Sequence, residues 1–276
     1  TQGVMGGNLA GYFLVHDDDS AASGDNQWFT IGARQAGKLG GLDYRVEYYH
    51  QFGDGAVPAT SSDQSAAYAT AATNTADIDR DAYLFGIRVG KTFKNDRMSP
   101  TFTLWYDNKS GNDDDDVNGN EYGGYHTVLD TGHKFYGLLD NYLSDIGDDT
   151  QRYGLEDIAI KAKFNVNEKN VFKVDWHQFL TQTDLEGSDS YTIRAAGGGA
   201  FAAARQGTGV LGNDLGQEID LTLVHKYDAN TKIVTGYSHY FTTVTHSWLN
   251  GSGAGDNSID NTDDQSWFYM MIDTTF

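Results

Sequence analysis

The stretch Val171-Phe-Lys-Val-Asp-Trp-His-Gln-Phe-Leu180 alternates apolar and polar residues along its length. In an extended chain the side chains of Phe172, Val174 and Trp176 point to one side, and the polar side chains between them point to the other. A period of two predicts a β-strand with one apolar and one polar face. Almost no segment of the chain carries the i, i+3, i+4, i+7 spacing of an amphipathic helix, so strands decide the fold.

The same alternation recurs in ten segments of about ten residues each. The predicted strands are 7–16, 27–36, 41–51, 82–93, 100–108, 155–164, 170–181, 217–227, 231–242 and 266–276. The 276 residues include 33 Gly, 17 Tyr, 14 Phe and 5 Trp, but 2 Pro and no Cys. No apolar run is long enough for a transmembrane helix. This composition is typical of a transmembrane antiparallel up-and-down β-barrel, which we expect to form a single domain over 1–276.

The predicted connections alternate between short and long. The short ones lie near 38–41, 94–99, 165–169 and 228–231, and the long ones near 17–26, 52–81, 109–154, 182–216 and 243–265. Outer-membrane barrels have tight periplasmic turns and long extracellular loops. An even number of strands places both ends of the sheet on the periplasmic side. The last strand ends on Phe276, which resembles the C-terminal signature of such barrels, so the sequence predicts an integral protein of a bacterial outer membrane.

The polar faces of these strands should line the lumen. Their charged residues are nearly balanced in sign, which suits a water-filled path. The predicted lining residues are Arg34, Asp43, Arg45, Glu47, Arg88, Asp107, Asp157, Lys161, Lys163, Lys173, Asp175, Glu218 and Asp220. The net charge of −20 therefore belongs mainly to the loops and argues against binding nucleic acid, whose phosphates require basic residues. An acidic rim would attract cations at low salt, although acidic loops also simply keep a surface solvated.

An acidic run in the longest loop has half of a calcium-loop pattern. Asp114, Asp116 and Asn118, followed by Gly119, offer oxygen ligands at alternate positions and a turning glycine. The closing Glu is missing. We therefore favour a solvated loop, with a bound Ca²⁺ as the alternative, and we expect no other cofactor.

Several stretches together resemble the alginate-export family of outer-membrane porins. They are Trp105–Gly111, the loop Thr131-Gly-His-Lys-Phe-Tyr-Gly137, Gly154–Asp157 with Phe172–Phe179, and Gly236–Phe241. The resemblance covers most of the chain, and the GHKFYG core is specific. Asp130 stands where the family usually has Pro. Family barrels have eighteen strands, so these ten strands form either a narrow barrel of their own or, as the resemblance implies, the C-terminal part of a longer barrel.

The resemblance implies a porin for diffusion or export of a polar solute or polysaccharide. In that porin His133, Lys134, Phe135 and Tyr136 would form a loop constriction at the outer mouth. The family's alginate exporters have strongly basic pores, whereas this wall is mixed. Expected partners are outer-membrane lipid, a polar solute or saccharide, and, as an open question, periplasmic or surface proteins. The alternative is a structural or adhesive barrel that displays acidic loops. A barrel enzyme would need clustered Ser, His and Asp at one rim, which the sequence does not show, so we expect no catalysis.

Overall fold

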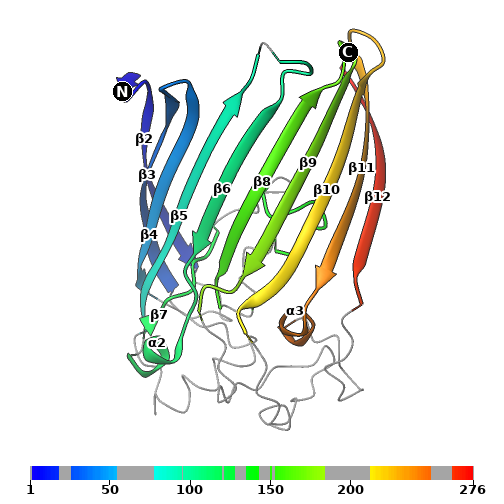
Figure 1. The fold of residues 1–276 in the computed structure, drawn as a ribbon. Coiled ribbons are helices and arrows are strands. Elements are labelled where there is room, and N and C mark those ends of the chain that lie inside the picture. Colours follow the sequence, from blue (N-terminus) through cyan, green and yellow to red (C-terminus); the bar gives the residue numbers. More distant parts are fainter. Residues whose placement is uncertain are drawn as a thin grey trace.

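The computed structural model describes residues 2–18, 26–54, 78–94, 96–119, 121–127, 135–142, 150, 153–183, 212–249 and 263–275. Ten long strands run through these residues, and all ten predicted segments are confirmed (Figure 1). They are β2 (Gly7–Asp18), β3 (Asn26–Leu39), β4 (Leu42–Asp54), β5 (Asp79–Thr92), β6 (Thr101–Lys109), β8 (Leu155–Asn165), β9 (Asn170–Leu180), β10 (Asp214–Lys226), β11 (Thr231–Thr242) and β12 (Gln265–Thr274).

Within the described residues, the remaining elements are short. They are the strands β1 (Gln2–Val4) and β7 (Glu121–Tyr122) and the helices α2 (Asp114–Gly119) and α3 (Val244–Leu249). No helix in the described ranges is long and apolar enough to cross a membrane. The chain is therefore all-β, as the alternating pattern predicts.

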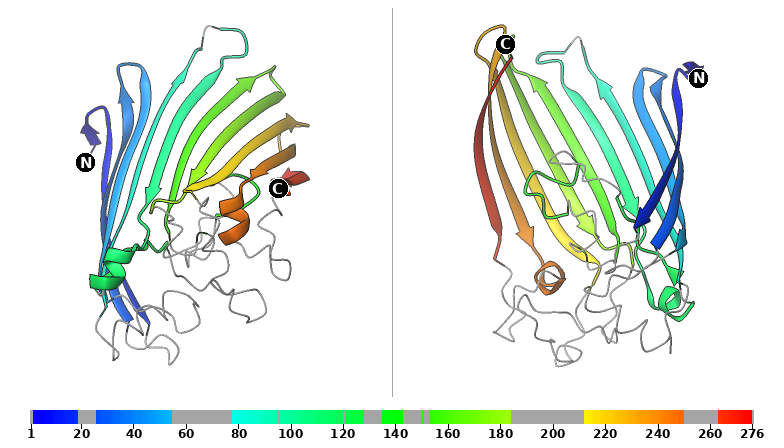
Figure 2. Two further views of the ribbon diagram at one scale, coloured as in Figure 1. Left: turned by 60° about the horizontal axis from the view of Figure 1, so that its bottom comes forward. Right: turned by 180° about the vertical axis from the view of Figure 1, so that it is seen from behind.

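Every long strand pairs antiparallel with its neighbour in the chain, so the sheet is an up-and-down meander from β1 to β12. β7 lies off this path and pairs in parallel with β5. The predicted start of β10 at residue 217 is wrong by three residues, because a register shift between Asp214 and Gly216 lets the strand continue past its apparent end. The curved sheet is open, with β1 and β12 at its two edges (Figure 2).

The two ends of the strands differ, as the loop lengths predict. Both termini lie at the end with the short turns (Figure 1). Two of these turns close on one acceptor side chain each: Asn167 Oδ1 accepts from the backbone N–H of Lys169 and Asn170, and Asp228 Oδ1 accepts from Asn230 and Thr231. Such side chains replace backbone acceptors in tight turns. The long connections all leave the opposite end, which we call the loop end.

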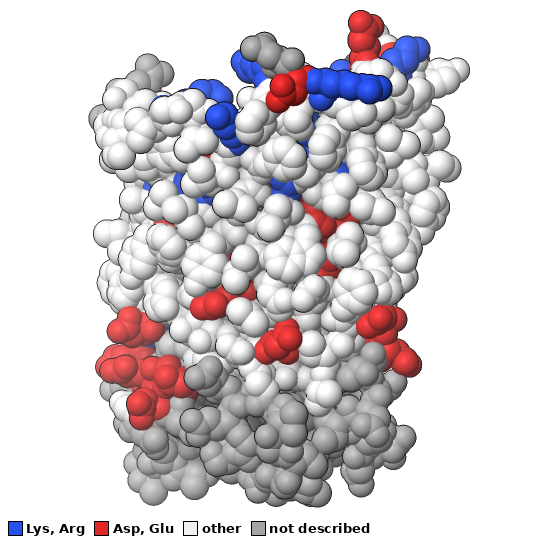
Figure 3. Space-filling model, in the orientation of Figure 1, with Lys and Arg blue, Asp and Glu red and all other residues white. Residues whose placement is uncertain are grey.

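The outer, convex face of the sheet is largely uncharged. Lys and Arg side chains gather at the short-turn end and Asp and Glu side chains near the loop end, with a mostly uncharged region between (Figure 3). Large apolar side chains such as Phe13, Leu104 and Ile160 are exposed there. A soluble protein rarely exposes so continuous an apolar surface, whereas a barrel needs one against lipid hydrocarbon.

Candidate channel lining and inner segment

The thirteen predicted lining residues share the concave face of the sheet. Cross-strand register places them there, since Arg34 lies opposite Glu47, Asp107 opposite Asp157, and Lys161 opposite Asp175. Side chains of the opposite sign meet along this face. The guanidinium of Arg88 lies 2.9 Å from Asp107 and 3.5 Å from Glu47. Arg45 also binds Glu47. The wall is thus a network of charge pairs rather than a ring of one sign.

The network continues across the second half of the sheet. Lys161 Nζ lies 3.6 Å from Asp175, and the Ser238 hydroxyl donates to Asp220. His177 Nδ1 lies 2.8 Å from Asp157 Oδ1, and both side chains are completely buried. Towards the short turns the wall becomes more basic. Lys163 lies opposite Lys173 there, whereas Asp43 is neutralised by Lys38.

Residues 135–142, which we call the inner segment, lie against this concave face. In the view from behind, the segment is seen inside the curved sheet, roughly halfway along the strands (Figure 2). The Phe135 ring meets Trp105 edge-on at 5.9 Å, and the guanidinium of Arg88 lies 3.4 Å from the centre of the Trp105 ring. Tyr136 is buried, with Lys109 Nζ 4.6 Å from its ring centre. Aromatic rings and cations therefore face each other at the start of the segment.

The middle of the inner segment is bound by one carboxylate. The backbone N–H groups of Leu138 and Leu139 both donate to Glu218 Oε1 on β10, at 2.6 and 2.9 Å. Gly137 has φ +80° and lies against the same carboxylate. Two successive N–H groups of the segment therefore share one acceptor oxygen of the wall.

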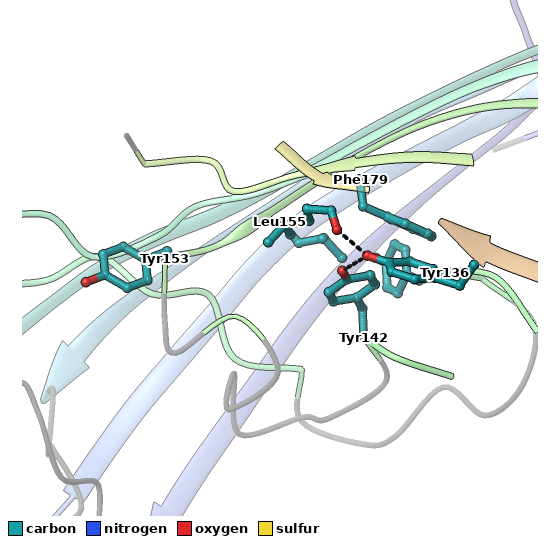
Figure 4. Close-up of a cluster of buried hydrophobic side chains, with 7 residues drawn as sticks. Tyr136, Tyr142, Tyr153, Leu155 and Phe179 are labelled. Atoms are coloured by element: carbon teal, nitrogen blue, oxygen red, sulfur yellow. Dashed lines mark hydrogen bonds between the residues drawn. The ribbon is translucent and has the colours of Figure 1, made fainter. Parts of the chain in front are cut away.

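The end of the inner segment is held in an aromatic pocket. Tyr142 packs against Phe179 at 4.7 Å between ring centres, and its hydroxyl binds the hydroxyl of Tyr240 (Figure 4). The same Tyr142 hydroxyl lies 2.9 Å from His246 Nδ1 of α3. Burial lowers the pKa of His246 to about 4, so the ring is neutral at pH 7.

A second part of the long β6–β8 connection also returns to the wall. We call residues 121–127 the lateral segment. The side-chain amide of Gln51 pairs with the backbone of His126 in both directions, accepting from its N–H at 3.0 Å and donating to its C=O at 2.6 Å. Arg80 donates to Gly124 O and lies between the rings of Trp28 and Tyr122, 4.6 and 4.8 Å from their centres.

The structure describes two of the four residues predicted to form the loop constriction. Phe135 and Tyr136 belong to the inner segment and lie against the concave face of the sheet, and their role in a loop constriction stays a prediction. His133 and Lys134 lie outside the described residues, as does Phe276. Sequence reasoning missed Gln51, Arg80, Tyr142, His177 and Tyr240. Strand phase was readable for Gln51, His177 and Tyr240, whereas Arg80 and Tyr142 fall in predicted loops. Most partners of these residues come from distant parts of the chain.

The acidic run forms the start of α2. Asp113 and Asp116 cap it reciprocally, because each side chain accepts from the other's backbone N–H at 2.9 Å. Burial is the main cause that raises the pKa of Asp116 to about 6. The side chains of Asp114 and Asn118 lie outside the described residues. In the described part, no three His, Asp or Glu residues are grouped as a metal site, and calcium binding stays a prediction.

A meander of amphipathic strands with an apolar outer face, a polar inner face and long loops at one end defines an integral outer-membrane β-barrel protein. The family model for alginate export matches residues 2–243, and the chain belongs to the alginate export family. No curated protein matches the sequence.

Solved structures give distant similarities. One is the outer-membrane expressed OmpT of Vibrio cholerae, with 12% identity over 95% of this chain and a TM-score of 0.40. Another is the P. putida toluene transporter TodX, with 11% identity over 97% of this chain and a TM-score of 0.30. The chain spans 63% and 65% of the lengths of those two proteins.

Proposed function

We propose that the chain forms an outer-membrane channel for a polar solute of the saccharide class, which passes by diffusion or export. The observation that carries the proposal is the inner face. It carries basic and acidic side chains in pairs, together with aromatic rings. Five of the acidic ones are buried, whereas exposed or partly exposed side chains remain at Arg34, Asp43, Arg45, Arg88, Lys161, Lys163, Lys173 and Asp175. Many weak polar contacts let a solute enter and leave, whereas one strong site would trap it.

The inner segment supports a narrow passage. It lies inside the curved sheet and brings Phe135 and Tyr136 towards Trp105 and the cations around it. A segment held at this depth reduces the open cross-section at one level of the lumen. A saccharide would meet rings and charged groups there, rather than at the outer rim.

A channel is favoured over a barrel enzyme by the surroundings of the Asp–His pair on the inner face, whereas two further pairs, His50–Asp81 and His239–Asp264, lie on the outward face of the strands. His177 and Asp157 are completely buried, and the His177 ring stacks on Phe179 at 5.4 Å. The Ser238 hydroxyl donates to Asp220 and not to this histidine. A substrate could not reach the pair without moving the wall.

The test is single-channel recording of the full chain in planar bilayers, with neutral and uronate oligosaccharides added to one side. The proposal expects discrete conductance steps and transient block by oligosaccharides. A chain that folds into the bilayer but passes no ions would overturn it and favour the alternative of a barrel that displays its loops at the surface. Removing residues 184–211 should then abolish surface attachment; in the channel it changes block kinetics instead.

A further inference from the structure

A single side chain, that of Glu218, forms the hydrogen bonds that attach the middle of the inner segment to the wall. Glu218 is 0% exposed, and its Oε1 accepts both hydrogen bonds from Leu138 and Leu139. Both bonds depend on that single oxygen atom. In water-poor surroundings their loss also leaves two N–H groups without an acceptor.

The segment is shaped to receive this carboxylate. Gly137 adopts a left-handed backbone conformation, and a Cβ at this position would overlap the Glu218 side chain. The chain therefore turns over the carboxylate at the one residue type that leaves room for it. Leu138 and Leu139 follow with both N–H groups directed at the same oxygen.

The surroundings of Glu218 point to a structural use of its carboxyl group. His177 lies opposite it on β9 and Tyr240 opposite it on β11, and both are completely buried. Asp220 follows on the same face of β10. A carboxylate enclosed in this way makes no direct contact with ions in the lumen. Its effect on transport must pass through the segment that it binds.

We propose that Glu218 is the positioning residue that holds the inner segment across the lumen and thereby sets the bore of the channel. The inference rests on the proposed function for its consequence in transport. The attachment itself can be measured without any transport. The two can therefore fail separately.

The experiment compares three variants with the unmodified full chain. Glu218→Ala removes the oxygen that accepts both hydrogen bonds, whereas Glu218→Gln keeps a side-chain oxygen in the same place and cannot ionise. Glu156→Gln is the matched control. Glu156 lies on the outward side of β8, where it accepts from Tyr106 and Asn108. Each protein is examined by amide hydrogen exchange and by single-channel recording, with far-UV circular dichroism to verify folding.

For Glu218→Ala we expect the exchange protection of Leu138 and Leu139 to fall by about tenfold or more, with a larger and noisier conductance. Glu218→Gln should restore most of the protection and the conductance, and its reversal potential in a salt gradient should equal that of the unmodified chain. Glu156→Gln should change neither measurement.

Two results would overturn the inference. One is unchanged protection of Leu138 and Leu139 in folded Glu218→Ala. The other is an equal shift of reversal potential in Glu218→Ala and Glu218→Gln with protection intact, which would mean that the charge acts on ions directly. If the unmodified chain does not conduct but protection falls as expected, the attachment stands and the proposed function fails.

Discussion

The inner segment and the lateral segment are both held by a side chain of the wall, but the two attachments use different chemistry. Glu218 offers one acceptor oxygen to two N–H groups of the inner segment. Gln51 offers a neutral donor and a neutral acceptor to the two sides of one residue, His126, in the lateral segment. Both side chains are completely buried.

The two attachments require different backbone conformations of their segments. The amide of Gln51 imitates a neighbouring strand, because it satisfies an N–H and a C=O together, and the lateral segment includes the short strand β7. The carboxylate of Glu218 satisfies N–H groups only, so the inner segment curls over it instead of extending. A further aromatic contact, through Tyr142, is then needed to fix the end of the inner segment.

The largest expected effect is on this aromatic contact. Replacing Tyr142 by Ala removes a buried ring from between Phe179 and Tyr240, at a cost of about 3–5 kcal/mol to the attachment of the inner segment. Exchange protection of residues 138–142 should collapse, while that of the lateral segment stays. Tyr142→Phe keeps the ring and loses the hydroxyl, so it should cost about 1 kcal/mol. An equal loss of exchange protection in both segments would show that the two segments open as one unit.

The next prediction concerns the Gln51 amide, which donates one hydrogen bond to His126 and accepts another from it. Gln51→Glu has the same shape but loses the donor to His126 O and sets a carboxylate against that carbonyl, at a cost of up to about 3 kcal/mol. The mirror-image change Glu218→Gln keeps an acceptor for both N–H groups and should cost less. Exchange rates of Tyr125, His126 and Thr127 measure the first, and those of Leu138 and Leu139 the second. A smaller loss of exchange protection in Gln51→Glu than in Glu218→Gln would contradict the roles assigned to the Gln51 amide and the Glu218 oxygen.

A smaller effect is expected at the glycine of the inner segment. Gly137→Ala strains a left-handed backbone and pushes against Glu218, which should weaken the attachment by about 1–2 kcal/mol. In a double variant with Glu218→Ala the steric part should disappear, because the group that it meets is gone. Gly119→Ala is the control, since an added Cβ there makes only ordinary contacts with Glu121. Fully additive exchange effects would contradict contact between Gly137 and Glu218.

The strands and their inward faces could be predicted because both are local properties. Alternation in Val171–Leu180 is read from consecutive residues, and it also fixes which side chains share a face. The inner-face positions of residues such as Arg88 and Glu218 follow from that alternation alone. The alternation of short and long connections likewise predicted which end of the sheet carries the tight turns and which the long loops.

The attachments could not be predicted, because they join distant residues without a local pattern. Leu138 and Glu218 are 80 residues apart in the chain, and Gln51 and His126 are 75 apart. A period of two says that Glu218 points inward, but not that a loop returns to cover it. The available signal was Phe135-Tyr136-Gly137, two rings that need burial followed by a residue free to turn. Nothing in the sequence states how deep that loop folds against the wall.

The smallest expected effect is a difference in pH response between the two segments. His246 holds Tyr142 in its neutral form, with a pKa of about 4 against an ordinary value of 6.5, so its contribution is complete above pH 6.5 and is lost as the pH falls towards 4. Asp116, which caps the helix before the lateral segment, has a pKa of about 6, above its ordinary 3.8. Its contribution is complete below 3.8 and is lost as the pH rises through 6.

Acidification from pH 7 to pH 5 should therefore loosen the end of the inner segment and tighten the turn from α2 into the lateral segment. Amide exchange at the two pH values, corrected for intrinsic rates, measures both in one sample. His246→Gln should remove the response of the inner segment, and Asp116→Asn that of the lateral segment, each without altering the other. A common loosening of both segments at pH 5 would instead mean that the charge network of the shared wall governs them together, and the two attachments would not be independent.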